Sequence, residues 1–279
     1  MRLGVFARTF EGSSPEAVLK AARRAGFETV QYNLACSGLG PLPRVISEGA
    51  CQAIRAAMAE TGVSIAAVSA TYNMVHPDRA ERDGGRQSFA AIAGIARGMG
   101  TRLVTVCTGS RNPHDQWRAH PDNASRAAWR DLCREFEDLI AIAERYDLLL
   151  GVEPELGNVV DSPLRARELF DALRSDRLRI VLDPANLFER ASPERRRALV
   201  EAAIDLLADR IQLAHAKDRD ADGRFVAAGQ GGIDFPHFLG RLRRSGFEGA
   251  VIAHGFAERE APGVATFLRT QLAQLDGQA

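Results

Sequence analysis

The 279-residue sequence has no net charge, because 36 Lys and Arg residues balance 36 Asp and Glu residues. Proteins that bind nucleic acid or an anionic membrane surface usually carry an excess of basic charge. The balance therefore argues against both partners. The one basic run, Arg195–Arg197, is expected to be the solvated face of an outer helix.

The sequence also lacks long apolar runs and paired cysteines. No apolar stretch approaches the roughly 20 residues of a membrane-spanning helix. The N-terminal Met1–Ala7 is interrupted too soon, by Arg8 and Glu11, to resemble a signal peptide. The cysteines show no CxxC spacing, which is typical of reduced thiols; they are Cys36, Cys51, Cys107 and Cys133. We therefore expect a cytoplasmic protein.

Aromatic residues are scarce, at 6%, whereas 46% of the residues are hydrophobic. This composition suits helices packed on a parallel sheet. Short apolar runs alternate with amphipathic segments along the whole chain, and each run is rich in Val, Ile or Leu on both faces. The runs are Leu3–Ala7, Thr29–Asn33, Ser64–Ala70, Leu103–Thr108, Leu148–Glu153, Leu178–Asp183, Arg210–His215 and Ala250–His254.

The segments between these runs carry helix start and stop signals. A serine followed by a proline predicts an N-cap and a first helical position at Ser14, Ser162 and Ser192, and Asp234 is a further candidate cap. Glycines that precede the next apolar run predict helix ends, at Gly26, Gly62, Gly100 and Gly246.

Strict alternation of strand and helix predicts a parallel sheet, and eight such units favour closure into a single (β/α)8 TIM barrel over residues 1–279. No GxGxxG follows the first strand, so a dinucleotide-binding fold is disfavoured. The longest connections all follow strands, which predicts a functional site at the carboxyl ends of the strands. These connections are Cys36–Pro43, Thr71–Gly85, Gly109–Asn123 and Lys217–Gly232.

Four consecutive predicted strands end in residues that can bind a metal. They deliver Glu153, Asp183, His215 and His254 to one rim of the barrel. Because neighbouring strands are about 4.8 Å apart, these side chains can converge. Taken singly, each could be a loop cap, a turn former or a hydrogen-bonded histidine. Together they favour one divalent ion, Mn, Mg, Co or Zn, since no thiolate is present.

The segments VEPE, LDPAN, HAKD and GQGGIDF resemble the xylose isomerase-like TIM barrels, which include sugar isomerases and epimerases, inosose dehydratases and the related apurinic endonucleases. The resemblance spans nearly the whole chain. It implies one divalent ion held by Glu, Asp, His and a second Glu from strands five to eight. The first three ligands correspond to Glu153, Asp183 and His215.

Two positions depart from the family pattern. The second Glu falls on His254, and a histidine three residues after the aspartate is replaced by Asn186. In the epimerases of the family, the two glutamates also transfer protons on either face of the substrate. Only Glu153 could do so unchanged here. Three roles stay open for His254: fourth ligand, proton carrier, or neither.

Further polar and aromatic residues are predicted to face a sugar from the same rim. These candidate substrate-binding residues are Asn33, Asn73, His76, Thr108, Arg111, Trp117, His120, Glu155, Asn186 and Asp218. Trp117 could equally anchor a loop. Lys217 could steady an oxyanion, relay a proton or pair with Asp218. Gln230, between two glycines, is expected in a tight turn that lets the backbone approach a ligand.

The leading hypothesis is a metal-dependent sugar or polyol isomerase or epimerase working through an enediolate, with Glu153 as base and His254 or Lys217 returning the proton. One alternative is a lyase or dehydratase acting on a keto-polyol or keto-glycoside. Another is a sugar-binding barrel without catalysis. An apurinic endonuclease is disfavoured, because that activity needs a cluster of several metals with more ligands than six histidines suggest, and a basic DNA-binding face that a chain of zero net charge is not expected to have. The expected partner is a small carbohydrate, and a homo-oligomer is left open because relatives are often dimers or tetramers.

Overall fold

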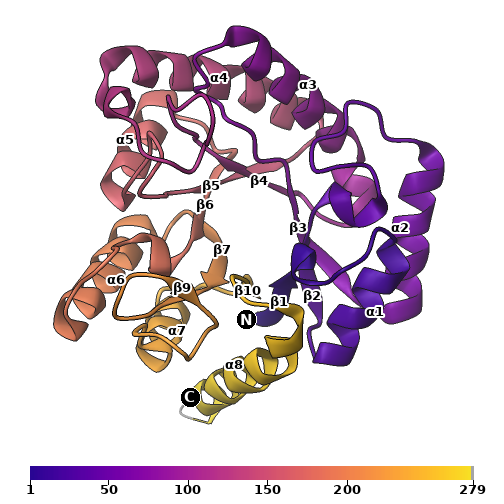
Figure 1. Cartoon of the computed structure of the whole chain (residues 1–279), viewed down its shortest axis with the longest axis vertical. Coiled ribbons are helices and arrows are strands. Elements are labelled where there is room, and N and C mark those ends of the chain that lie inside the picture. Colours follow the sequence, from indigo (N-terminus) through magenta and orange to yellow (C-terminus); the bar gives the residue numbers. More distant parts are fainter. Residues whose placement is uncertain (278–279) are drawn as a thin grey trace.

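A computed structural model describes residues 1–277 as a closed barrel of parallel strands surrounded by helices (Figure 1). The barrel order is β1-β10-β7-β6-β5-β4-β3-β2, so the first and last barrel strands pair and close the sheet. The strands are β1 (Arg2–Phe6), β2 (Thr29–Tyr32), β3 (Ser64–Ser69), β4 (Leu103–Cys107), β5 (Leu149–Glu153), β6 (Leu178–Leu182), β7 (Ile211–Ala216) and β10 (Ala250–Ala253). The predicted single (β/α)8 TIM barrel is confirmed.

The helices begin and end close to the predicted signals. They are α1 (Pro15–Ala25), α2 (Glu48–Thr61), α3 (Arg79–Ala96), α4 (Arg126–Arg145), α5 (Pro163–Leu173), α6 (Pro193–Leu207), α7 (Phe235–Arg244) and α8 (Ala261–Asp276). Ser14, Ser162, Ser192 and Asp234 each accept a hydrogen bond from a backbone N–H of the first turn, as an N-cap does. No helix within residues 1–277 is both long and apolar enough to cross a membrane.

The core has two parts. A small cluster of strand residues is formed by Ala67, Leu103, Val181, Leu213, Ala250 and Ile252. A larger cluster joins other strand residues to the buried helix residues. Gly4 shows how tightly the strands pack, because a Cβ there would lie 2.5 Å from Ile252 Cδ1 and 2.8 Å from the Thr29 carbonyl oxygen.

The connection after β3 is shorter than the predicted Thr71–Gly85, because α3 already begins at Arg79. Asp78 caps this helix by accepting a hydrogen bond from Ala80 N at 2.8 Å. Gly84 and Gly85, which look like loop residues in the sequence, lie inside α3. Packing explains the second glycine, since a Cβ on Gly85 would be 2.1 Å from the Tyr72 ring.

The connection after β7 contains a small antiparallel hairpin that was not predicted from the sequence. It consists of β8 (Asp218–Arg219) and β9 (Phe225–Val226). Its strands follow directly on the predicted site residues of β7, so it forms part of the rim at the carboxyl ends of the barrel strands.

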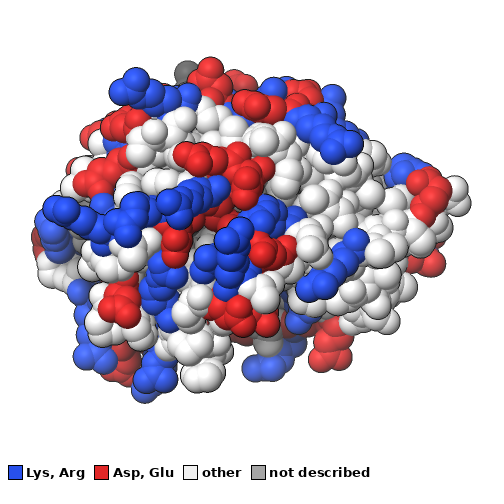
Figure 2. Space-filling view, turned by 90° about the horizontal axis from the view of Figure 1, so that it is seen from above, with Lys and Arg blue, Asp and Glu red and all other residues white. Residues whose placement is uncertain are grey.

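Charges of both signs mix on the outer helices. Figure 2, which views the molecule from above relative to Figure 1, shows basic and acidic side chains interspersed on one face. Between α3 and α4, for example, Arg86 forms ion pairs with Asp83, Glu135 and Asp138. On this face, charges of both signs are therefore mixed and do not form separate patches.

Candidate active site

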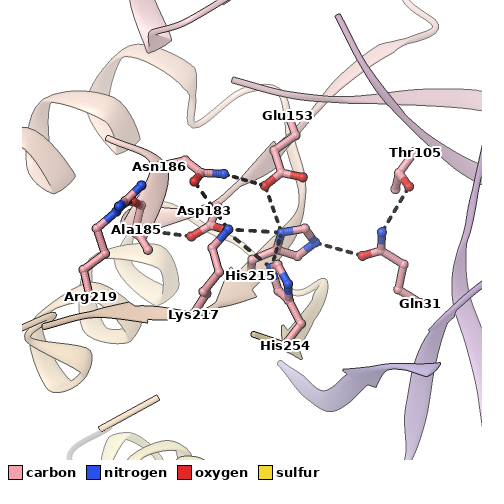
Figure 3. A network of polar contacts seen from close by, with 10 residues as sticks. All are labelled: Gln31, Thr105, Glu153, Asp183, Ala185, Asn186, His215, Lys217, Arg219 and His254. Carbon is pink, nitrogen blue, oxygen red and sulfur yellow. Dashed lines mark hydrogen bonds and ion pairs between the residues drawn. The ribbon is translucent and has the colours of Figure 1, made fainter. Parts of the chain in front are cut away.

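Four predicted ligands converge at the carboxyl ends of adjacent strands (Figure 3). Glu153 ends β5, Asp183 follows β6, His215 lies in β7 and His254 follows β10. One ligand atom from each residue lies within 4.8 Å of the others. The parallel register of the barrel thus brings residues from four separate strands to one point.

The spacing of these atoms fits one small cation. Nδ1 of His215 lies 3.2 Å from Glu153 Oε1, 3.8 Å from Asp183 Oδ2 and 3.2 Å from His254 Nε2. The distance between His254 Nε2 and Asp183 Oδ2 is 3.5 Å. Four ligands at about 2.1 Å from a metal in tetrahedral geometry would be about 3.4 Å apart. The donor set of two carboxylates and two imidazoles suits a divalent ion.

Asp183 is the most deeply buried of the four, with a fully buried side chain. Its Oδ1 accepts a hydrogen bond from Ala185 N at 2.9 Å. Its Oδ2 accepts no well-directed hydrogen bond from residues 1–277, although Lys217 Nζ lies 2.9 Å away as an ion-pair partner. A buried carboxylate oxygen that is incompletely satisfied is a suitable metal ligand.

A relay of amide and hydroxyl groups fixes the ring of His215. The ring Nε2 lies 2.8 Å from Gln31 Oε1, and Gln31 Nε2 donates to Thr105 Oγ1 at 3.1 Å. Because Oε1 can only accept, Nε2 must carry the proton. This arrangement leaves Nδ1 facing the other ligands, as a metal-binding histidine requires.

Asn186 orients two groups of the site. Its Nδ2 donates to Glu153 Oε1 at 2.9 Å, and its Oδ1 accepts from Lys217 Nζ at 3.3 Å. Asn186 is buried, so these bonds are shielded from water. The residue therefore holds the Glu153 carboxylate and the buried ammonium in fixed positions.

The charges of the site shift its pKa values in opposite directions. Burial favours neutral His215, but the carboxylates of Glu153 and Asp183 outweigh burial and raise the pKa of His215 to about 9. Burial and the positive charge on His215 lower the pKa of His254 to about 4. The pKa of Asp183 stays well below its usual range, because Lys217 and the two histidines offset the cost of burial.

Glu155 differs from Glu153, although the two are separated by one proline. Burial, and then the negative charge of Glu153, raise the pKa of Glu155 well above its usual range. For Glu153, burial acts in the same direction, but His215 reverses the effect and lowers the pKa. Beside the ionised Asp183 and Glu153, the site thus contains a third carboxyl group, Glu155, that favours its neutral form.

Three of the four candidate metal ligands line a cavity of about 320 Å³. They are Glu153, His215 and His254, and Lys217 and Glu155 line the cavity with them. Aromatic side chains line other parts, of which Trp117 is 47% exposed and Phe225 is 46% exposed. The volume lies at the lower end of the range for small-molecule sites, about 300–1,000 Å³.

Asp218 does not face this cavity. Its side chain is fully buried and accepts backbone hydrogen bonds from Gly229, Gly231 and Ile233, at 2.9–3.1 Å. A Cβ on Gly231 would lie 2.4 Å from Asp218 Oδ1. The sequence predicted that the backbone of the GQGG turn approaches a ligand. In the structure this backbone instead approaches the buried carboxylate of Asp218.

Six other predicted substrate-binding residues lie outside the residues that line the cavity, and each has a role in its own loop. Asn33 and His120 accept hydrogen bonds from backbone N–H groups at the start of 3-10 helices. The other four contact neighbouring loop residues, most of them through backbone groups; they are Asn73, His76, Thr108 and Arg111. Their assignment to substrate binding gains no support from this geometry.

Several residues of the site were not predicted from the sequence. Gln31 lies inside β2 and so lacks the strand-end position that identified the ligands, and Phe225 lies in a loop whose hairpin was not expected. Phe6 and Ser69 also line the cavity, from the last residues of β1 and β3. Their position at the ends of predicted strands is the sequence feature that could have identified these two residues.

The chain belongs to the family of xylose isomerase-like TIM barrels, whose model matches residues 19–271. No curated protein matches the sequence significantly. Among solved structures, it is similar to 3-keto-D-glucoside 4-epimerase YcjR from E. coli, with 17% identity, 99% of both chains covered and a TM-score of 0.75.

Two further structures show the same similarity. For L-ribulose 3-epimerase, the identity is 17%, the coverage is 99% of this chain and 96% of the other, and the TM-score is 0.77. For D-psicose 3-epimerase from Clostridium cellulolyticum H10, the identity is 14%, the coverage is 98% of this chain and 99% of the other, and the TM-score is 0.76. At these identities, the similarity shows a shared fold.

Proposed function

We propose that the protein is a divalent-metal-dependent sugar or polyol isomerase or epimerase. The observation that carries this proposal is the cluster of Glu153, Asp183, His215 and His254, three of which line a cavity of about 320 Å³. The epimerases among its structural neighbours support the same class of reaction.

Each residue of the site has a distinct part in this reaction. A bound divalent cation would polarise the substrate carbonyl and offset the negative charge of the enediolate. Glu153 is ionised and lines the cavity, so it can take the proton from the carbon beside the carbonyl. Asn186 and His215 both contact Glu153 Oε1, which fixes the carboxylate plane.

The proton must then return to the substrate from a second group. Lys217 lines the cavity and carries a proton at Nζ that it can deliver. His254 also lines the cavity, but its pKa of about 4 leaves the ring neutral near pH 7, so it can relay a proton and not supply one. The family resemblance implies a second glutamate where this chain has His254, so the group that returns the proton differs here. The difference bears on which carbon and which face of the substrate receive the proton, and therefore on whether the product is an epimer or an aldose–ketose isomer.

The same substitution favours a second candidate, a lyase or dehydratase that shares the enediolate step. Loss of the second glutamate removes one proton-returning group, and expulsion of a leaving group would then complete the reaction. Product analysis separates the two candidates, because isomerisation conserves the mass of the substrate and elimination does not.

The test uses Mn²⁺-loaded protein and a panel of ketoses in D₂O, with deuterium incorporation followed by NMR. Wild-type protein should introduce deuterium beside the carbonyl, and Glu153→Gln should abolish the exchange while the circular dichroism spectrum stays unchanged. Glu137→Gln, on the exposed face of α4, is the matched control and should behave as wild type. Retained exchange in Glu153→Gln would refute the role of this residue.

A further inference from the structure

A second cavity adjoins the candidate active site. It has a volume of about 670 Å³ and shares Phe6 and Phe225 with the first cavity as lining residues. Its other walls come from β9, from the segment after β1 and from the segment after β10. The two spaces are therefore neighbours on the same rim of the barrel and share two phenylalanines as lining residues.

We propose that this outer cavity is a subsite for a second sugar ring, so that the substrate is a glycosylated keto-sugar and not a free monosaccharide. This inference rests on the proposed function, because it extends the substrate of the same site. The reacting ring would occupy the inner cavity over Glu153 and His254, and the glycosyl group would pass Phe225 into the outer one.

The volumes support this division. The inner cavity of about 320 Å³ is near the lower limit for small-molecule sites, which is the size expected for one sugar ring. The outer cavity is about twice as large and more open. A monosaccharide bound at the ligands would leave the outer space empty.

The outer walls combine apolar and polar groups as sugar sites do. Phe225 and Phe256 offer apolar ring surface, and Arg8 and Gln230 offer polar groups. No hydrogen bond or ion pair engages the Arg8 guanidinium or the Gln230 side-chain amide within residues 1–277, so both are free to bind hydroxyl groups. Arg8 and Glu260 contribute opposite charges to the same space, so the lining has no net charge and favours a neutral polyhydroxyl ligand over an ion.

The wall between the cavities is rigid. Phe225 lies on β9, and Lys217 Nζ and Arg219 Cζ are each 4.0 Å from its ring centre. Arg219 Nε also donates to the Ala185 carbonyl at 2.6 Å. The Asp218 side chain also accepts hydrogen bonds from Gly229 N and Gly231 N in the turn that follows β9, so contacts hold the hairpin on both sides of Phe225.

The test compares the affinity of Mn²⁺-loaded protein for fructose with that for turanose, lactulose and isomaltulose, in which a hexosyl group is attached to fructose at O3, O4 or O6. Isothermal titration calorimetry measures Kd without requiring turnover. We expect at least one disaccharide to bind about tenfold more tightly than fructose.

Val226→Trp places a bulky side chain on the outer wall of this subsite. It should remove the advantage of the disaccharide and leave the affinity for fructose within about twofold. Val45→Trp, at a position that is 81% exposed, is the matched control and should retain the wild-type ratio. If the variant fails to fold, the wild-type ratio alone decides.

Equal or weaker binding of all three disaccharides would overturn the subsite, and so would a failure of every probe to bind. The proposed function has a separate readout, which is deuterium exchange on any keto-sugar. Exchange without disaccharide preference would reject only the subsite, whereas disaccharide binding without exchange would reject only the catalytic proposal.

Discussion

At the scale of single residues, the site depends on side chains that contribute no ligand atom. Gln31 contacts His215 Nε2 at 2.8 Å and is itself held by Thr105, so it sets which ring nitrogen of His215 faces the other three candidate ligands. Asn186 orients Glu153 in the same way. Such positioning residues determine ligand geometry from outside the set of ligands.

Replacing Gln31 should therefore weaken metal binding. Gln31→Leu removes the acceptor for His215 Nε2–H, and we expect the Kd for Mn²⁺ to rise about 10- to 100-fold. Gln87→Leu, at an exposed position of α3, is the control and should leave the Kd unchanged. Isothermal titration calorimetry with Mn²⁺ measures the Kd of both variants. An unchanged Kd in Gln31→Leu would show that the hydrogen bond from His215 to Gln31 has no role in metal binding.

Arg111 illustrates the opposite case, a predicted substrate-binding residue that the structure places in a structural contact. Its guanidinium pairs with Asp131 Oδ2 at 2.5 Å and donates to the Val75 carbonyl at 3.1 Å. Burial raises the pKa of Asp131, but Arg111 more than compensates and the pKa is lowered. The pair therefore stabilises the protein only while Asp131 is ionised.

Arg111→Met should lower the free energy of unfolding by about 1–2 kcal/mol at pH 7. Because the folded-state pKa of Asp131 is depressed, its contribution is present above the unfolded pKa of about 3.9 and is lost as the pH falls through the folded value. The difference in the free energy of unfolding between Arg111→Met and wild type should therefore become smaller below about pH 4. Urea unfolding across this range measures it, and a constant difference would contradict the ion-pair role.

At the scale of elements, the hairpin β8–β9 and the GQGG turn form one unit around Asp218. Gly231 permits the close approach, because a Cβ there would lie 2.3 Å from the Arg219 carbonyl oxygen and 2.4 Å from Asp218 Oδ1. The turn also supports the hairpin that presents Phe225. Changes in the turn should therefore reach the wall of the active-site cavity.

Gly231→Ala should destabilise the protein by about 2 kcal/mol or more and weaken disaccharide binding as Phe225 shifts. Gly263→Ala is a matched control, since this glycine lies in α8 and a Cβ there would meet no other atom within 4 Å. The control should be neutral or stabilising by up to about 1 kcal/mol. Equal stability of both variants in thermal unfolding would argue against a tight Asp218 turn.

The elements also show which features could be predicted from the sequence. Glu153, Asp183, His215 and His254 were identifiable because each ends a strand in a regular series, and the barrel converts this series into proximity. The polar loop residues had no such signal. A residue such as Asn73 binds loop backbone at Ser110, because the buried backbone groups of a long loop need partners of their own.

At the scale of the whole molecule, the strand order determines which side chains meet. Glu153, Asp183, His215 and His254 come from the neighbouring strands β5, β6, β7 and β10. The pairing of β1 with β10 closes the ring and brings β2, with Gln31, to the same site. This closure could be predicted from eight alternating units. The role of Gln31 could not, because it reaches His215 from the far side of the barrel, across 184 positions of sequence.

The most direct test of the central claim is the Mn²⁺ stoichiometry and affinity of wild-type protein and His254→Ala, with His114→Ala at an exposed loop position as the control. We predict about one ion per chain in wild type and control, and at least a tenfold loss of affinity in His254→Ala. Wild-type protein that binds no Mn²⁺, Co²⁺ or Zn²⁺ would contradict the metal centre. Full affinity in His254→Ala would contradict the assignment of His254 as its fourth ligand.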